Sequence, residues 1–371
     1  MQDDVSISDV MENDETNLNN IFTVDTEHDD YMGVQDSLYY TEEEYVSLLK
    51  KCNYTDEKNI KIISLNIANL LSKLSGLKSL LISLSDKKNK PNIIVITETH
   101  IQLQRNQGYK EDELRNIIPG YKFFHHDRNG KGGGIGFFID KDICDNTDIN
   151  VKSYFTEGVF EGLMVTIPGG ILIGNNRRNL VILGVYRPPT RAPGDEQVNT
   201  FLTILSDWLK QMDKSSNEIM ITGDMNLDLL KFEHHHPTAE YIDTMTKHQL
   251  LPYIVRPTRL KHRSATLIDH IFMKGNRRVL SGILATEIAG PYGFTDHFPL
   301  FCVLDIRLMR RPKQLFEKKF FTSDGHRERK RGLINENWDE IYEQEDPDLI
   351  YEILQSKYCE HYQHLNHQKN T

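Results

Sequence analysis

Seven short runs rich in Ile, Val, Leu and Phe recur along the middle of this 371-residue chain, and segments of helical spacing lie between them. Their continuous apolar character is typical of strands buried on both faces of a sheet. The runs cover residues 59–66, 91–99, 132–140, 180–186, 218–224, 267–273 and 299–308, and the helical segments cover 70–84, 195–212 and 238–250. These strands are too many for one small open sheet. We therefore predict an α/β fold, a four-layer sandwich of two packed mixed sheets flanked by helices.

The ends of the chain differ in charge from its body. The net charge is −10, but residues 1–50 hold 14 Asp or Glu against one Lys, which leaves the rest slightly basic. Thr41 followed by Glu44 forms a capping box and predicts a short helix near 42–51. We expect three parts, namely an acidic and largely disordered segment over 1–55, a folded domain over 56–308, and a basic linker with a helical tail over 309–371.

Positive charge is concentrated in two stretches. Residues 256–278 contain seven Lys or Arg and one acid, and residues 307–331 contain ten Lys or Arg against three acids. Such clusters suit a polyanion such as nucleic acid, although a solvated surface explains either one equally well. The RERKR sequence at 327–331 fits a nuclear localisation signal, a nucleic-acid arm or a solvated linker.

Cysteine usage and hydropathy bear on the compartment. The four cysteines are scattered without a CxxC pair, which argues against a zinc ribbon and a disulfide scaffold. No apolar run approaches the ~20 residues that span a bilayer. The acidic N-terminal sequence also lacks the apolar centre of a secretory signal. We expect an intracellular, nuclear protein with no membrane partner.

Polar side chains stand where the predicted strands end. In layered α/β folds ligands gather at strand ends, because the loops there are free to carry polar groups. Each such residue alone is more simply explained as a turn, a cap or a structural histidine. Several of them in one chain favour a site, and the set comprises Asn66, Glu98, Tyr186, Asp224, Asn226, Asp269, Asp296 and His297.

The composition of this set indicates a type of chemistry. Oxygen donors dominate and Cys is absent, which suits Mg²⁺ or Mn²⁺ rather than zinc. Hydrolysis of a phosphodiester needs an aligned water, stabilisation of the charged transition state and help for the leaving oxygen. A carboxylate that holds the metal, an Asp and an Asn that align the water, and a His paired with an Asp would meet these needs.

Seven sequence blocks follow the order found in the endonuclease/exonuclease/phosphatase superfamily: ISLNIANL, IIVITETH, GGGIGFFI, VILGVYRPP, IMITGDMNLDLL, PTRLKHRSATLIDHIF and TDHFPLF. Over residues 60–306 the chain therefore resembles this superfamily. Within it, the VYRPP and PTRLKHRSATLIDHIF blocks resemble the apurinic-type endonuclease domain of non-LTR (LINE-like) retrotransposons. This resemblance implies a deoxyribonuclease I-like fold and a monomeric domain that nicks duplex DNA, leaving a 3′-hydroxyl and a 5′-phosphate. The tail around 338–362 is similar to the linker before the reverse transcriptase of such elements.

The resemblance also implies a metal site that holds Mg²⁺ or Mn²⁺. Glu98 would be the principal ligand, Asn66 would orient the carboxylates on the metal side, and Asp296 would lie beside the metal. One departure from many relatives is Pro189, which stands where they have an asparagine.

The remaining positions receive catalytic roles from the same resemblance. Asp224 would position and deprotonate the attacking water, and Asn226 would hold that water or the phosphate. Tyr186 would donate a hydrogen bond to the scissile phosphate. Asp269 would orient His297, which would contact the phosphate.

The basic segment RPTRLKHRSAT at 256–266 leads directly into Asp269. We expect it to form a loop or hairpin that lies against the DNA backbone and adds salt-dependent affinity. The expected DNA contacts are Arg259, Lys261, Arg263, Thr258 and Thr266. RNA binding by the basic tail is a further expectation.

Two other functions fit the same residues. One is an abasic-site repair endonuclease or another phosphodiesterase of the same fold, which preferential cleavage of abasic duplex would favour. The other is a catalytically decayed module that binds nucleic acid. Glu98, Asp224, Asp269 and His297 are all of the types that catalysis needs, and nothing structural requires all four, which argues against decay.

Overall fold

The computed structural model describes residues 37–52, 54, 59–84, 89–101, 110–126, 132–169, 172–173, 178–189, 196–213, 217–261, 264–274, 279–286, 288–289, 293–308, 323–344 and 346–360. The chain divides into two compact units, residues 1–310 and 311–371. The first unit contains both sheets and every candidate site residue that the structure describes.

The larger sheet has eight strands among the described residues, in the order β1-β15-β16-β2-β3-β5-β4, with β8 paired to β16. At its centre β2 (Asn59–Asn66) runs parallel to β3 (Ile93–Thr97) and antiparallel to β16 (Leu300–Leu308). The other strands are β1 (Tyr39–Tyr40), β4 (Tyr121–His126), β5 (Ile135–Asp140), β8 (Leu172–Ile173) and β15 (Val279–Leu284).

The smaller sheet has six strands in the described part of the chain, in the order β11-β14-β10-β9-β7-β6. Its central strand β10 (Glu218–Asp224) runs parallel to β9 (Leu180–Tyr186) and antiparallel to β14 (Asp269–Lys274). The other strands are β6 (Asn150–Thr156), β7 (Phe160–Ile167) and β11 (Leu250–Pro252), and a separate hairpin consists of β12 (Arg259–Lys261) and β13 (Ser264–Thr266).

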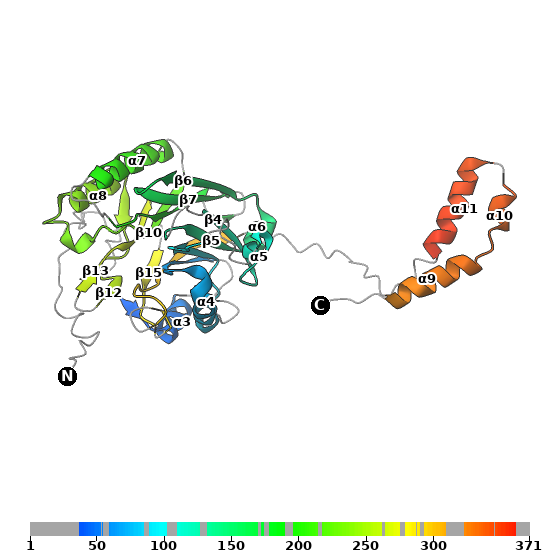
Figure 1. The fold of residues 1–371 in the computed structure, drawn as a ribbon, viewed down its shortest axis with the longest axis horizontal. Coiled ribbons are helices and arrows are strands. Elements are labelled where there is room, and N and C mark those ends of the chain that lie inside the picture. Colours follow the sequence, from blue (N-terminus) through cyan, green and yellow to red (C-terminus); the bar gives the residue numbers. More distant parts are fainter. Residues whose placement is uncertain are drawn as a thin grey trace. The chain divides into compact units, whose positions relative to one another are not determined.

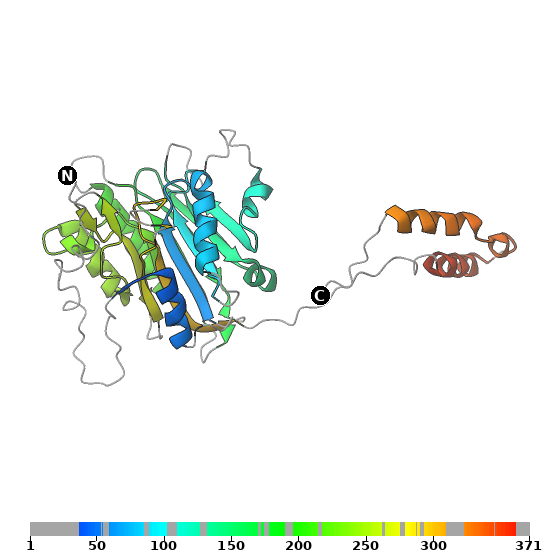
Figure 2. The same cartoon turned by 90° about the horizontal axis from the view of Figure 1, so that it is seen from below.

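Helices cover the outer face of each sheet (Figure 1). Helices α7 (Glu196–Asp213) and α8 (His236–Lys247) lie over the six-stranded sheet. Helices α3 (Glu42–Lys51) and α4 (Leu70–Leu84) lie over the eight-stranded sheet, as Figure 2 shows from below. The short helices are α5 (Glu111–Arg115), α6 (Lys141–Asn146) and the 3-10 turn η3 (Leu229–Lys231). This helix–sheet–sheet–helix order confirms the predicted four-layer α/β sandwich.

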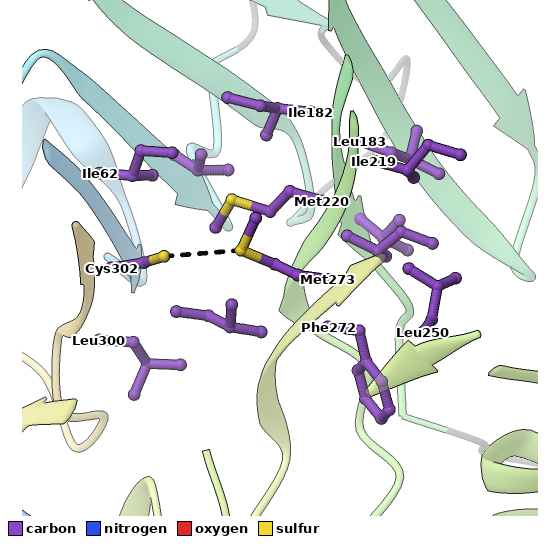
Figure 3. Close-up of a cluster of buried hydrophobic side chains, with 14 of the residues drawn as sticks. Ile62, Ile182, Leu183, Ile219, Met220, Leu250, Phe272, Met273, Leu300 and Cys302 are labelled. Carbon is purple, nitrogen blue, oxygen red and sulfur yellow. Dashed lines mark hydrogen bonds between the residues drawn. The ribbon is translucent and has the colours of Figure 1, made fainter. Parts of the chain in front are cut away.

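The continuous apolar runs are explained by burial on both faces of the eight-stranded sheet. On β2, Ile60 and Ile62 belong to the core between the sheets, whereas Ile63 packs in the second core with α3 and α4. Figure 3 shows the core between the sheets, where Sγ of Cys302 on β16 lies 3.8 Å from Sδ of Met273 on β14. The two sheets are therefore in direct side-chain contact.

Helix α4 has the predicted bounds, although Gly76 is a weak helix former. A Cβ at Gly76 would lie 2.5 Å from Cδ1 of Phe294, so the glycine lets this ring pack against the helix. The other two helices differ slightly from prediction. Helix α7 begins at Glu196, and α8 ends at Lys247, because the chain turns at 248–249 and enters β11.

The segment before residue 56 differs in part from the expected disorder. Residues 1–36 lie outside the described part of the chain. Helix α3 forms with the predicted capping box between Thr41 and Glu44 and buries Tyr45 and Leu49. The two residues of β1 pair in parallel with β15, so the sheet begins before residue 56.

The second unit contains α9 (Ser323–Asn335), α10 (Asp339–Tyr342) and α11 (Pro347–Glu360). Nζ of Lys357 on α11 donates hydrogen bonds to the carbonyl oxygen of Asn337 at 2.7 Å and to Oε1 of Glu336 at 3.1 Å. The structure thus gives the predicted helical tail three helices. Across the described residues of both units, no helix is long and apolar enough to cross a bilayer.

Candidate active site

Three candidate residues lie side by side at the end of the six-stranded sheet. Asp224 on β10 is the register partner of Tyr186 on β9 and of Asp269 on β14. Register partners on adjacent strands project from the same face of a sheet, so the three side chains form one row. The residue before Asp224 has to be glycine, because Gly223 has a φ of 131° and its Cβ would lie 2.0 Å from the carbonyl oxygen of Val185.

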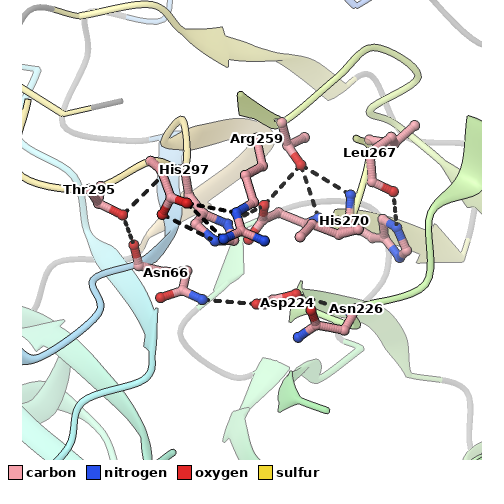
Figure 4. Close-up of polar contacts among 12 residues, drawn as sticks. Asn66, Asp224, Asn226, Arg259, Leu267, His270, Thr295 and His297 are labelled. Carbon is pink, nitrogen blue, oxygen red and sulfur yellow. Dashed lines mark hydrogen bonds and ion pairs between the residues drawn. The ribbon is translucent and has the colours of Figure 1, made fainter. Parts of the chain in front are cut away.

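Asn66 connects this row to the other sheet. It ends β2 in the eight-stranded sheet, and its Nδ2 donates a hydrogen bond to Oδ2 of Asp224 at 2.8 Å (Figure 4). The same Nδ2 also donates to Oε1 of Glu98 at 3.0 Å. Its Oδ1 accepts the backbone N–H of Ala68 at 3.0 Å, which fixes the amide orientation. Asn66 therefore orients two carboxylates that come from different sheets.

Glu98 lies just after β3 in a strained backbone conformation. Glu98 and His100 have φ values of 54° and 53°, which non-glycine residues rarely adopt and which cluster at functional sites. Nε2 of His100 lies 3.3 Å from Oε2 of Glu98. Burial opposes ionisation of Glu98, but hydrogen bonds from His100 and Asn66 hold its pKa below the ordinary value. Glu98 is thus held as a carboxylate.

Tyr186 presents a neutral hydroxyl to the same site. Burial raises its pKa above the ordinary value, and the nearby carboxylates of Glu98, Asp224 and Glu161 raise it further. A phenol that stays protonated remains a hydrogen-bond donor over the whole physiological range.

Asp269 and His297 form a buried hydrogen-bonded pair. Nδ1 of His297 lies 2.8 Å from Oδ2 of Asp269, and the hydroxyl of Thr258 donates to the same oxygen at 2.8 Å. Burial lowers the pKa of His297, but the charge and hydrogen bond of Asp269, with the charges of Asp224 and Asp296, raise it to about 9. At neutral pH His297 is therefore a cation whose Nε2–H faces away from Asp269.

The pKa of Asp224 differs strongly from that of an ordinary aspartate. Burial and the charge of Asp269 raise it to about 7, against the opposing effects of His297 and of the Asn226 backbone N–H. That N–H donates to Oδ1 of Asp224 at 2.9 Å. A carboxylate with a pKa near neutrality is suited to accept a proton from water.

A buried arginine fixes the loop after Asp224. Nε and Nη2 of Arg187 donate to the carbonyl oxygens of Met225 and Asn226, each at 2.6 Å. In return, Nδ2 of Asn226 donates to the carbonyl oxygen of Arg187 at 2.8 Å. Asn226 has a positive φ of 46°, a conformation that these bonds hold in place. In this structure the Asn226 amide thus binds the backbone that follows Tyr186.

Asp296 forms a contact that the sequence did not predict. Its Oδ2 accepts hydrogen bonds from Nε of Arg259 at 2.9 Å and from Nη2 at 2.7 Å. Its Oδ1 lies 3.8 Å from Nε2 of His297. Burial would raise the pKa of Asp296, but the hydrogen bonds from Arg259 hold it below the ordinary value. Asp296 and Arg259, expected to contact metal and DNA respectively, pair with each other here.

Two of the other expected DNA contacts, Lys261 and Thr266, lie on the β12–β13 hairpin. Lys261 is exposed, Thr266 is half-buried, and Arg263 lies outside the described residues. Thr258 requires a correction. It is completely buried, and its hydroxyl donates to Asp269 and accepts the backbone N–H groups of Ile268 and Asp269, so it supports Asp269 and cannot contact a phosphate.

Two groups of residues could hold a divalent metal. Asp224, Asp269 and His297 bring one ligand atom each within 4.8 Å of one another. However, the Nδ1 of His297 is bonded to Asp269 and the imidazole is cationic, so this group fits proton transfer better than metal binding. The second group is Glu98 with Asn66, whose amide orients an anionic carboxylate, and an oxygen ligand of this kind suits a hard cation such as Mg²⁺ or Mn²⁺. The residues present therefore fit a metal on the Glu98 side.

Three site residues were not found from the sequence. Arg187 directly follows Tyr186, and the only signal was its place in the VYRPP block. His100 follows Glu98 by two residues in the TETH sequence. Glu161 on β7 is the register partner of Tyr186 and accepts a hydrogen bond from the backbone N–H of Gly134, a contact that depends on strand order.

Comparisons with known proteins agree with this fold. Residues 63–297 match the model of the Endonuclease/Exonuclease/phosphatase family. Similar solved structures include the AP endonuclease LMAP from Leishmania major, with 12% identity and a TM-score of 0.53 over 75% of this chain and 94% of that one. Another is the 3′ phosphatase NExo from Neisseria bound to a product DNA hairpin, with 14% identity and a TM-score of 0.51 over 66% of this chain and 99% of that one. No curated protein sequence matches the chain.

At these identities the solved structures show a shared fold and nothing finer. The family match is independent of them and spans well over half of the chain, including Glu98, Tyr186, Asp224, Asp269 and His297. The chain belongs to the Endonuclease/Exonuclease/phosphatase family.

Proposed function

We propose that this protein is a metal-dependent endonuclease that nicks duplex DNA, of the type found in non-LTR retrotransposons. The observation that carries the proposal is the bridge from Asn66 to both Glu98 and Asp224. It joins Glu98, an anionic carboxylate that suits a divalent metal, to Asp224, whose pKa of about 7 suits a general base. The retrotransposon type is supported by the VYRPP and PTRLKHRSATLIDHIF blocks.

In the proposed reaction Asp224 accepts the proton of a water as that water attacks phosphorus. The Asn226 backbone N–H and the Asn66 amide hold the carboxylate in place, so its position is set before substrate arrives. Asp269 keeps His297 protonated, and the Nε2–H of His297 donates to a phosphate oxygen. The Tyr186 hydroxyl donates to a second phosphate oxygen, and together these donors stabilise the charge that develops in the transition state.

A divalent metal, Mg²⁺ or Mn²⁺, would be held by Glu98 with Asn66 orienting that carboxylate. When bound, it would stabilise negative charge on phosphate oxygens and on the leaving 3′-oxygen. The products would be a 3′-hydroxyl and a 5′-phosphate. The hairpin of β12 and β13 would lie along the DNA backbone and present Lys261 to a phosphate.

The test is nicking of supercoiled plasmid by the full chain in Mg²⁺ and in EDTA. His297→Ala removes the proposed phosphate donor, and the exposed His234→Ala is the matched control. We expect Mg²⁺-dependent conversion to open circles by the wild type and His234→Ala, and a loss of at least ~100-fold in His297→Ala. The nicks should be extended by a DNA polymerase, which requires a 3′-hydroxyl.

Other outcomes would replace the proposal. Faster cleavage of an abasic duplex than of intact DNA would identify a repair endonuclease on the same site. DNA binding without nicking by any variant would identify a binding module. Nicking that persists in His297→Ala would contradict the site assignment.

A further inference from the structure

A short segment before α3 is hydrogen-bonded to the stretch of chain that leads into Thr258, which supports the proposed catalytic pair. The hydroxyl of Ser37 donates to the carbonyl oxygen of Tyr253 at 3.0 Å and accepts the backbone N–H of Val255 at 3.0 Å. The hydroxyl of Tyr39 donates to the carbonyl oxygen of Pro257 at 2.7 Å. Residues 37–40, which we call the N-terminal strap, are thus bonded to alternate residues of the segment between β11 and β12.

The strap is also part of the eight-stranded sheet. Tyr39 and Tyr40 are register partners of Ile283 and Leu284 on β15. The backbone N–H groups of Ile283 and Ala285 donate to the carbonyl oxygens of Leu38 and Tyr40 at 3.0 and 2.9 Å. Because the strap is hydrogen-bonded to the sheet as well as to the 253–257 segment, it fixes the position of that segment relative to the sheet.

The residue after Pro257 supports the catalytic pair. Thr258 donates its hydroxyl to Oδ2 of Asp269, the oxygen that holds His297. Its carbonyl oxygen accepts the backbone N–H of Phe298 at 2.8 Å, and Phe298 directly follows His297. The ring of Tyr39 packs edge-on against the ring of Phe298, with the centroids 5.6 Å apart. Tyr39 therefore contacts the neighbours of both Thr258 and His297.

We propose that Tyr39 is a positioning residue for the Asp269–His297 pair, and that the N-terminal strap contributes to catalysis by holding the 253–257 segment in place. The expected effect on kcat rests on the proposed function, but the effect of Tyr39 on the position of the His297 ring can be measured without it. Loss of the Tyr39 hydroxyl frees the carbonyl of Pro257 and lets Thr258 move. A shift of Thr258 changes the hydrogen bond that sets the direction of the His297 ring.

The experiment compares two tyrosine variants of the full chain. Tyr39→Phe removes the bond to Pro257. Tyr121→Phe is the control. Tyr121 lies on β4, outside the proposed site, and its buried hydroxyl donates to the carbonyl oxygen of Pro91 at 2.6 Å, a bond of the same kind. Ser37→Ala is a second variant of the strap, for use if Tyr39→Phe folds poorly.

Two quantities are measured for each variant. We expect Tyr39→Phe to lower the kcat of plasmid nicking by about tenfold with little change in KM, because small displacements of a catalytic group are costly. Ser37→Ala should act in the same direction but less strongly. The second quantity is the proton NMR resonance of Nδ1–H of His297, identified by its loss in His297→Ala. It should shift in Tyr39→Phe and stay in place in Tyr121→Phe.

The outcomes separate this inference from the proposed function. Unchanged kcat and an unchanged Nδ1–H resonance in Tyr39→Phe would overturn the inference and leave the nuclease intact. Equal losses in Tyr39→Phe and Tyr121→Phe would also overturn it, because general destabilisation would then explain both. If the wild type does not nick, the proposed function fails, and the Nδ1–H resonance alone decides whether Tyr39 positions His297.

Discussion

Nδ1 of His297 lies 2.8 Å from Oδ2 of Asp269, and both side chains are buried. A buried carboxylate in direct contact favours the charged form of an imidazole. The His297 ring therefore keeps its positive charge at the end of the six-stranded sheet, where a phosphate would need it. That charge and the hydrogen bonds around it can be tested one residue at a time.

The charge of His297 depends on Asp269. In metal-free protein we expect His297 to titrate near pH 9, as followed by its C2–H NMR resonance. In Asp269→Asn the largest influences that raise the pKa of His297 are lost and burial still lowers it, so the midpoint should fall well below 9. The exposed Asp243→Asn on α8 is the control and should leave the midpoint unchanged. A midpoint near 9 in Asp269→Asn would show that another group holds the proton.

The same shift has a consequence for stability. The folded-state pKa of about 9 lies above the ordinary value of 6.5, so folding favours the protonated imidazole. This contribution is fully present below about pH 6.5 and is lost as pH rises through about 9. Asp269→Asn should remove that pH dependence from the free energy of unfolding.

Thr258 supports Asp269 and does not contact DNA. Thr258→Val keeps the shape but leaves Asp269 without one donor, so we expect it to lower the free energy of unfolding by about 1–3 kcal/mol. It should also lower kcat while leaving the salt dependence of DNA binding unchanged. Thr244→Val on α8, where the hydroxyl donates to the carbonyl oxygen of Glu240, is the matched control, with little effect on kcat. A flatter salt dependence in Thr258→Val would restore the phosphate-contact interpretation.

Arg187 fixes the loop that follows Asp224. Arg187→Met leaves the carbonyl groups of Met225 and Asn226 without these donors, which should lower the free energy of unfolding by about 2–4 kcal/mol. The rate of nicking should fall as well, because Asn226 would be free to leave its positive-φ conformation. Arg178→Met, at a largely exposed arginine, is the control, with urea unfolding as the measurement. Equal stability of the two variants would mean that the Arg187 bonds contribute little.

Lys261 lies on the exposed side of the β12–β13 hairpin. Lys261→Glu should weaken DNA binding and reduce the slope of log K against log salt by about 1 for each phosphate that is no longer neutralised. Lys247→Glu on α8 makes the same charge change away from the hairpin. Binding titrations at several salt concentrations would measure both slopes. If the two variants have the same slope, the hairpin does not contact the DNA backbone.

The sequence predicted the strands in the middle of each sheet and missed the strands towards the edges. The bounds of β2, β9 and β10 agree with prediction because every residue in these strands is buried. Those of α4 agree because its buried leucines recur at helical spacing. The strands β4, β7, β11 and β15 were not predicted, and neither was β6. Its residues are largely exposed or half-buried, in a pattern set by its place at the edge of the sheet. Its two-residue counterpart β1 is too short to give any periodic signal.

The candidate site shows the same limit. Its strand-end residues could be found because polar residues that interrupt apolar runs can be recognised in the amino-acid sequence itself. The roles of Thr258 and Arg187 could not, since each depends on register between segments far apart in the chain. The pairing of Asp296 with Arg259 likewise depends on where the hairpin crosses His297.

The position of Asn66 has a consequence for the whole molecule. Tyr186, Asp224 and Asp269 belong to one sheet, so backbone pairing fixes their spacing, whereas Asn66 and Glu98 belong to the region of the other. The separation of the sheets is set by core side chains such as Met273 and Cys302. The volume of the side chains between the sheets would therefore affect the proposed catalysis. A smaller residue there would change the distance from Asn66 to Asp224 while leaving the row on the smaller sheet unaltered.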